Sequence, residues 1–295
     1  MSAASHDSLW ERLRYGPLLR ASRRSPAGAR RFASIVAAVE RRLEAERVGV
    51  AEDRIMRWLG VSRPQASRIF RDALFSEALE EADSARMMAH PSAPLLPIEI
   101  EGHAPRGGRP RIYAALHAGS PVLAFMGLRK RFEPDVRIIA RELDEENPMA
   151  NAKQAFALRK VAWVEEVSGA KFIDTDGEAI LEARDHLLSG RPLFAAVDVP
   201  GDVVSRTDRV GLFGETVVLA SGIFRLAAMT GADMQLVVSE HRDGRILVRC
   251  RPPFEASDAA SLLAAMAPEM EAVLRDQPGE FWFWPFFVSP QMGDS

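Results

Sequence analysis

The sequence predicts an α/β protein: a mixed, mostly parallel β-sheet with flanking helices, preceded by an N-terminal helical region. Residues 8–90 carry apolar side chains at the three- and four-residue spacing of amphipathic helices. From residue 111 onward, short apolar runs of strand length alternate with helical periods, a pattern typical of strands joined by crossover helices. We therefore expect a helical region at 1–90, a connection at 91–110 and an α/β domain at 111–288.

Three helices are expected in the N-terminal region. The face of the first is formed by Phe32, Ile35, Val36, Val39 and Leu43. The other two are expected at 52–58 and 64–88. Between residues 90 and 111, five prolines and a Gly-Gly pair predict loop structure, with room for one short strand at 96–100.

The elements of the α/β domain follow in order. Strands are expected at 111–116, 136–140, 171–174, 193–199, 234–241 and 245–249. Helices are expected at 150–166, 178–189, 218–230 and 258–275. The last helix ends before an aromatic tail that begins at Phe281.

Composition excludes several classes of protein. The 295 residues are 47% hydrophobic with a net charge of -3, which excludes a mainly disordered chain. The single cysteine, Cys250, cannot form an internal disulfide. No apolar run reaches the roughly 18 residues that cross a bilayer, and the arginine-rich start is unlike a signal peptide. A cytoplasmic protein is expected.

Positive charge is concentrated at the N-terminus. Residues 1–42 hold nine arginines and three acidic residues, a local charge of +6, so the rest of the chain sums to -9. Apolar side chains lie among these arginines: Leu9, Trp10, Leu13, Leu18 and Leu19. Such a segment suits peripheral contact with the cytoplasmic face of the inner membrane, or an ordinary solvated helical start. Both interpretations stay open.

Residues 52–74 have the outline of a helix-turn-helix. Gly60 ends the first helix, and Ser62 would cap a second helix, which carries Gln65, Ser67, Arg68 and Arg71. A helical hairpin has the same outline, and the excess of basic residues in this segment is small. DNA binding is therefore an alternative, while a structural hairpin and no nucleic-acid partner are the main expectation.

A histidine follows the first strand of the α/β domain. His117 is placed at the carboxyl end of that strand, where an imidazole can act as general base on a hydroxyl. The small residues Gly119 and Ser120 come next, and their backbone N–H groups are candidates to hold an oxyanion. The histidine could equally be a structural one.

Further motifs follow in a fixed order. Gly190-Arg191-Pro192 leads into a strand that ends at Asp198. Phe213-Gly214-Glu215 then precedes the expected helix 218–230, which ends in Thr230-Gly231-Ala232, and Pro278 to Phe283 closes the series. The order and spacing of these motifs resemble the bacterial lipid A lauroyl/myristoyl acyltransferase family, part of the glycerolipid acyltransferase superfamily, over roughly residues 30–288.

The resemblance implies a glycerolipid acyltransferase-like fold and transfer of a fatty acyl group from an acyl-carrier-protein or coenzyme A thioester to a hydroxyl. It implies His117 as general base and a substrate- or oxyanion-binding role for Gly119, Ser120, Phe213, Gly214 and Glu215. The family places an acid five positions after its histidine, and that position here is Val122. The replacement we expect is Asp198, because parallel strands bring their carboxyl ends to one edge of the sheet; Glu215 is a weaker candidate.

Two further differences from the family pattern limit the classes of acceptor that we expect. The family's basic His-Arg-Arg-Phe element is replaced by Pro285-Phe286-Phe287-Val288, and we do not expect a counterpart of the family's N-terminal membrane-spanning helix. The expected acceptor is therefore a hydroxyl on a lipid, glycan or secondary metabolite, rather than a strongly anionic lipid A precursor. The alternative is a catalytically silent homologue that binds acyl chains or a partner protein.

No cofactor is expected. His103, His186, His241 and Cys250 lack the spacing of metal ligands, so we expect no metal site. The glycines match neither a phosphate-binding loop nor a dinucleotide fingerprint.

Overall fold

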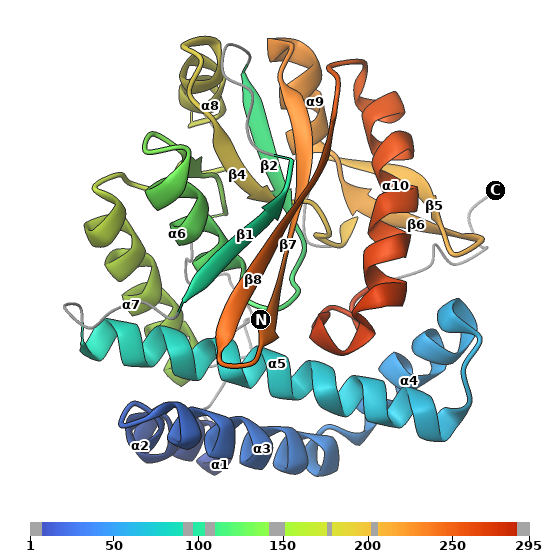
Figure 1. Ribbon diagram of the computed structural model, residues 1–295. Helices are drawn as coiled ribbons and strands as arrows, with labels where there is room; N and C mark the ends of the chain where they lie inside the picture. The colour runs from blue at the N-terminus through green and yellow to red at the C-terminus, as the bar shows by residue number, and fades with distance from the viewer. Residues whose placement is uncertain are drawn as a thin grey trace, which may run out of the picture.

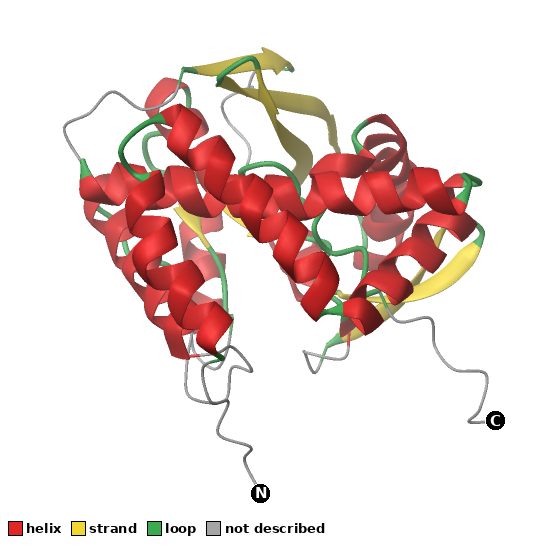
Figure 2. Ribbon diagram, turned by 90° about the horizontal axis from the view of Figure 1, so that it is seen from below, coloured by secondary structure: helices red, strands yellow, loops and turns green. Residues whose placement is uncertain are grey.

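The computed structural model describes residues 8–90, 97–103, 110–141, 151–175, 179–201 and 206–287. It confirms the α/β class, with a central sheet, helices on both faces and an N-terminal group of helices across one end (Figures 1 and 2). The N-terminal helices are α1 (Leu9–Leu13), the π-helix η1 (Arg14–Leu18), α2 (Leu19–Ser22), α3 (Pro26–Leu43), α4 (Ala45–Leu59) and α5 (Arg63–Ala89).

The central sheet has six strands in the order β1-β8-β7-β2-β4-β3, and all neighbours are parallel except the β7–β8 hairpin. The strands are β1 (Ile98–Gly102), β2 (Arg111–Ala115), β3 (Arg137–Ile138), β4 (Leu193–Ala196), β7 (Asp233–Arg242) and β8 (Arg245–Phe254). A separate hairpin pairs β5 (Thr207–Leu212) with β6 (Glu215–Ala220). The strand β1 lies inside the expected connection and joins the edge of the sheet through β8.

Alternating side chains of the central strands face two cores. On one face, Ile112 and Ala114 of β2 belong to a core that also contains side chains of α4, α5 and three later helices: α8 (Ala179–Leu188), α9 (Gly222–Thr230) and α10 (Ala259–Asp276). On the other face, Tyr113 and Ala115 pack toward α6 (Pro121–Arg131) and α7 (Asn151–Ser168). Every residue of β2 is buried, as expected for a central strand covered on both faces.

Several details of the elements and of their burial differ from the sequence prediction, and β5 was not expected at all. Residues 218–220 belong to β6, so the expected helix 218–230 begins only at Gly222 as α9. The expected strand 171–174 is reduced to an isolated bridge between Ile139 and Ile173. In α3 the buried face contains Phe32 and Val36, whereas Ile35 and Leu43 are exposed, because the helix packs on α5 along its alanine-rich side.

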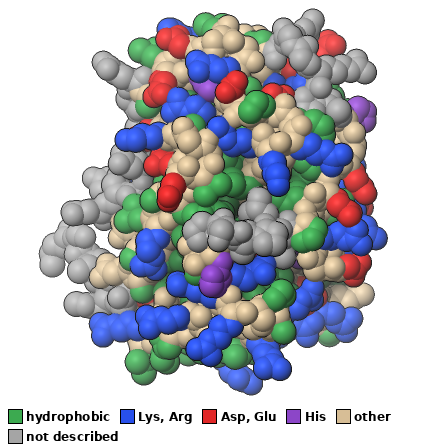
Figure 3. Space-filling model, turned by 60° about the vertical axis from the view of Figure 1, so that its left-hand side comes forward, with side chains coloured by type: hydrophobic (Ala, Val, Ile, Leu, Met, Phe, Trp, Pro, Cys, Tyr) green, Lys and Arg blue, Asp and Glu red, His purple; other side chains and the backbone are tan. Residues whose placement is uncertain are grey.

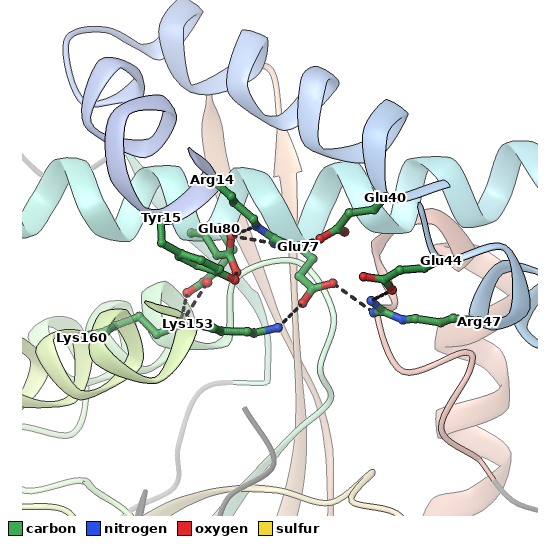
Figure 4. Close-up of polar contacts among 10 residues, drawn as sticks. Arg14, Tyr15, Glu40, Glu44, Arg47, Glu77, Glu80, Lys153 and Lys160 are labelled. Carbon is green, nitrogen blue, oxygen red and sulfur yellow. Dashed lines mark hydrogen bonds and ion pairs between the residues drawn. The ribbon is translucent and has the colours of Figure 1, made fainter. Parts of the chain in front are cut away.

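The N-terminal helices are joined to the body through a network of charged side chains around α5 (Figure 4). Arg14 of η1 forms ion pairs with Glu40 of α3 and Glu81 of α5. Tyr15 donates its hydroxyl to the same Glu81 at 2.8 Å. All four side chains are nearly or fully buried, so the network fixes η1 against α3 and α5.

On the other side of α5, lysines from α7 complete the network. Lys160 pairs with Glu80 at 3.1 Å, and Lys153 pairs with Glu77 at 3.3 Å. Burial alone would raise the pKa of Glu77, but Lys153, Arg47 and Arg14 lower it to about 2. The charged form of Glu77 is therefore the form that the folded protein stabilises.

Candidate active site

The candidate site lies where β2 and β4 end. Ala115 of β2 pairs with Ala196 of β4, and the Val197 N–H donates to the Ala115 carbonyl at 3.0 Å. His117 and Asp198 each come two residues after that pair, so the parallel register places them side by side. The sequence argument that parallel strands share one carboxyl edge thus applies to these two residues.

Asp198 holds His117 through both carboxylate oxygens. Its Oδ1 lies 2.8 Å from Nδ1 of the imidazole, and its Oδ2 accepts the backbone N–H of His117 at 2.6 Å. Asp198 is fully buried, whereas the His117 side chain is 28% exposed. Because a carboxylate only accepts hydrogen bonds, the proton of the neutral ring lies on Nδ1. The other ring nitrogen, Nε2, then carries a lone pair.

The C-terminal aromatic tail forms the wall behind the imidazole. The Phe283 ring stacks on His117 at a centroid distance of 3.9 Å and an interplanar angle of 8°, and the Trp282 ring meets it edge-on. The backbone N–H of Trp282 also donates to the backbone carbonyl of His117 at 2.9 Å. Neighbouring Phe281 and Trp284 are buried in the core. The tail therefore fixes the histidine ring in orientation, a role that its composition alone did not reveal.

The backbone N–H groups of Gly119 and Ser120 do not match their expected role as oxyanion donors. The Gly119 N–H donates to the Glu280 carbonyl at 3.0 Å, and the Ser120 N–H donates to Ser239 Oγ at 2.9 Å. Gly119 has a φ of +61°, and a Cβ there would overlap with the carbonyl oxygen of Ser239. The loop is thus packed tightly on β7, and both donors are already used in holding it there.

Phe213, Gly214 and Glu215 have their described contacts with elements other than the histidine, and their expected role at the site stays a prediction. Phe213 and Gly214 have positive φ values and form the turn between β5 and β6. Glu215 accepts from the Trp58 indole at 3.1 Å and pairs with Arg57, so it is held by α4.

The distance along β6 shows how far Glu215 lies from the segment that follows Asp198. The point of β6 that bridges to the segment after Asp198 is Leu219, paired with Pro200. Glu215 lies four residues earlier, about 13 Å along an extended strand. Asp198, rather than Glu215, is therefore the carboxylate beside the imidazole.

A second histidine lies at the same edge of the sheet. His241, near the end of β7, is 3.4 Å from Asp83 and 3.8 Å from Glu280, and its side chain is 10% exposed. Burial alone would lower the pKa of His241, but the nearby carboxylates of Asp83 and Glu280 raise it to about 9. This histidine is held as a cation at neutral pH and is poorly suited to act as a base.

The helix-turn-helix outline corresponds to α4 and the first part of α5. The second helix is not a short projecting one, because α5 continues to Ala89 and packs on α3 and α4. Phe70 and Leu74 are buried, while Arg68 and Arg71 are exposed and Arg71 pairs with Asp72. This geometry is that of a structural hairpin, and it lends the DNA-binding alternative no support.

Within the part of the chain that the structure describes, no group of three or more His, Cys, Asp or Glu side chains could hold a metal ion. None of the described helices is long and apolar enough to cross a bilayer. Neither a scan of protein-family models nor a search of curated proteins gave a match to this chain.

Proposed function

We propose that this chain is a cytoplasmic O-acyltransferase that moves a fatty acyl group from an acyl-carrier-protein or coenzyme A thioester to a hydroxyl of a lipid, glycan or secondary metabolite. We assign it as a divergent member of the lipid A lauroyl/myristoyl acyltransferase family, with a glycerolipid acyltransferase-like fold. The observation that carries the proposal is the Asp198 Oδ1 to His117 Nδ1 hydrogen bond of 2.8 Å.

The proposed reaction uses the free lone pair on Nε2 of His117. Nε2 removes the proton from the acceptor hydroxyl as its oxygen attacks the thioester carbonyl. The carbon–sulfur bond then breaks, and the leaving thiolate takes the proton from the imidazolium. Asp198 keeps the ring in the tautomer that has a basic Nε2 and stabilises the imidazolium that forms.

Val122 stands where the family has the acid that orients its histidine, and this difference is compatible with the proposed reaction. Valine cannot accept a hydrogen bond from an imidazole. Asp198 supplies the missing carboxylate from the neighbouring strand, in a buried position where its hydrogen bonds are protected from water. The orienting group has thus moved in sequence, while its relation to the histidine ring is the one that a general base requires.

The test is thiol release from acyl-carrier-protein and coenzyme A thioesters of several chain lengths, with water as the default acceptor. Wild-type protein is compared with His117→Ala, and His90→Ala serves as the matched control because His90 is exposed at the end of α5. We expect release to fall at least about 100-fold in His117→Ala and to be unchanged in His90→Ala. Equal rates for all three proteins would argue against the proposal.

A catalytically silent homologue that binds acyl chains or a partner protein is the second candidate. It is favoured by the engaged N–H groups of Gly119 and Ser120, since an acyltransferase needs donors for the oxyanion. This candidate predicts that thioesters bind to wild-type protein and to His117→Ala alike, and that neither protein releases thiol above the rate without protein.

A further inference from the structure

The outer sides of α1, α2 and α7 carry exposed leucines among arginines. Leu9 is 75% exposed, Leu13 is 41% exposed, and Leu158 on α7 is 46% exposed. The arginines on or next to the same helices are Arg12, Arg20, Arg23, Arg24 and Arg159. We refer to these eight residues as the arginine–leucine face. Figure 3 shows Lys and Arg side chains gathered with hydrophobic ones along the lower part of the molecule, where the N-terminal helices lie.

The helices that carry this face lie against one another. α7 contacts both α1 and η1, and the Tyr15 and Phe156 rings lie 5.7 Å apart between them. The inner sides of the same helices are already used: Leu19 and Phe156 belong to a buried cluster, and Lys153 and Lys160 reach into the charged network of Figure 4. The exposed leucines are therefore on the side opposite to the core, on helices that are held rigidly.

The five arginines of the face have no acidic partners among the described residues. None of them forms an ion pair or side-chain hydrogen bond with any residue that the structure describes, and Nε of Arg23 is buried without a hydrogen-bond partner there. Burial lowers the pKa of Arg23, and the nearby charges of Arg159 and Arg20 lower it further. In the network around α5, by contrast, each arginine lies beside a carboxylate. An anionic partner would relieve this concentration of positive charge.

We propose that the arginine–leucine face docks on an anionic lipid surface, with Leu9, Leu13 and Leu158 inserted into the interface and the arginines at the level of the headgroups. Leu9 and Leu13 are four residues apart and therefore share one side of α1. Apolar side chains that enter the acyl boundary, flanked by cations that meet anionic headgroups, are the features of interfacial binding. This inference does not depend on the acyl-transfer chemistry, although it would bring a lipid hydroxyl close to the protein.

The test is co-sedimentation of the full chain with vesicles of pure phosphatidylcholine and with vesicles that contain phosphatidylglycerol. We expect binding only to the anionic vesicles, and loss of that binding near 1 M salt, where the Debye length is about 3 Å. Each arginine near an anionic surface strengthens binding about fivefold, so the combined change Arg20→Gln, Arg23→Gln and Arg159→Gln should weaken it about 100-fold. The pair Leu9→Ser and Leu13→Ser should also weaken binding to the anionic vesicles at low salt, because it removes the apolar side chains that enter the interface.

The matched control is on α8, at the opposite end of the molecule in Figure 1. Leu188 is 59% exposed there, and Arg184 and Arg191 lie beside it in sequence. The combined change Arg184→Gln, Leu188→Ser and Arg191→Gln should leave vesicle binding unchanged, and circular dichroism checks that all variants are folded. The proposal is overturned if the wild type does not bind anionic vesicles, if the α8 control loses binding equally, or if the face binds an acidic carrier protein and not the vesicles.

Discussion

Replacement of Asp198 by asparagine is the sharpest test of how the candidate site works. Oδ2 of Asp198 accepts the backbone N–H of His117 at 2.6 Å, and only an oxygen can take that place. The side-chain NH₂ of the substituted asparagine must then face Nδ1 of the imidazole, where Oδ1 lies at 2.8 Å in the wild type. Because the NH₂ donates, Nδ1 has to accept, and the ring proton moves to Nε2.

This change of tautomer removes the base without removing the histidine. With a proton on Nε2, the ring cannot accept the proton of an attacking hydroxyl. In hydrolases with the same His–Asp arrangement, the exchange lowers kcat about 10⁴-fold, equivalent to about 5 kcal/mol of transition-state stabilisation. Asparagine has nearly the same shape as aspartate and keeps both hydrogen bonds, so we expect the free energy of unfolding to change by no more than about 1 kcal/mol.

Three measurements check the reasoning. Thiol release should fall about 10³- to 10⁴-fold in Asp198→Asn and less than twofold in Asp185→Asn, a matched exchange at an exposed carboxylate. Urea denaturation should show near-equal stability. Nitrogen-15 NMR of the histidine rings should show the proton of His117 on Nδ1 in the wild type and on Nε2 in the variant. A wild-type rate for Asp198→Asn, or a ring proton on Nε2 in the wild type, would refute the assignment.

Three other changes have outcomes that the structure fixes. Gly119→Ala should lower the free energy of unfolding, measured by urea denaturation, by about 3 kcal/mol, because Gly119 has a positive φ and a Cβ there would overlap with the backbone of β7. The control Gly49→Ala, in α4 with nothing within 4 Å, should raise the free energy of unfolding by up to about 1 kcal/mol. Equal effects of the two changes would contradict the tight packing of the loop. Glu77→Gln should lower the free energy of unfolding by about 2–3 kcal/mol near neutral pH. Thermal denaturation should show this difference disappear as pH falls from 4.5 toward 2, because the wild-type carboxylate is protonated in that range. A difference that does not depend on pH would contradict the assigned pKa of Glu77. The folded-state pKa of His241 is about 9, above its ordinary value of 6.5, so the charged histidine stabilises the fold fully below pH 6.5 and progressively less up to about pH 9. The melting temperature of the wild type should therefore fall as pH rises across that range, and His241→Gln should make this fall smaller. A fall of the same size in the variant would show that other groups cause it.

The pairing of His117 with Asp198 could be predicted from the sequence in part, because the position of each residue at a strand end is a local feature. Each residue follows a short apolar strand, and the crossover helices of an α/β fold connect such strands in parallel. Their carboxyl ends then share one edge of the sheet. Which strands are neighbours in the sheet could not be read from the strand ends alone. The structure shows that β2 and β4 are adjacent.

The contacts of the other expected site residues could not be predicted from local sequence patterns. The expected oxyanion donors of Gly119 and Ser120 are engaged by Glu280 and Ser239, which lie more than a hundred residues away in sequence. No local pattern reports such backbone hydrogen bonds. Phe213-Gly214 forms a hairpin turn in which a phenylalanine adopts a positive φ, a conformation that turn-residue statistics do not suggest for phenylalanine.

The wall formed by the aromatic tail was not foreseen for a related reason. Phe281 and Trp284 are buried while Phe283 stacks on the imidazole, and all three lie in a run of six aromatic residues among seven. Composition indicates that such a segment docks against something, but the surface it meets is set by the arrangement of α5 and β2.

The proposed reaction depends on His117 as the general base, and the most direct test is the ratio of initial thiol-release rates between wild type and His117→Ala at one saturating acyl thioester concentration. We expect a ratio of at least about 100, with both proteins binding the thioester and sharing the same melting temperature. A ratio of one, with thioester bound equally by both proteins, would contradict it and would leave a domain that holds acyl chains without transferring them.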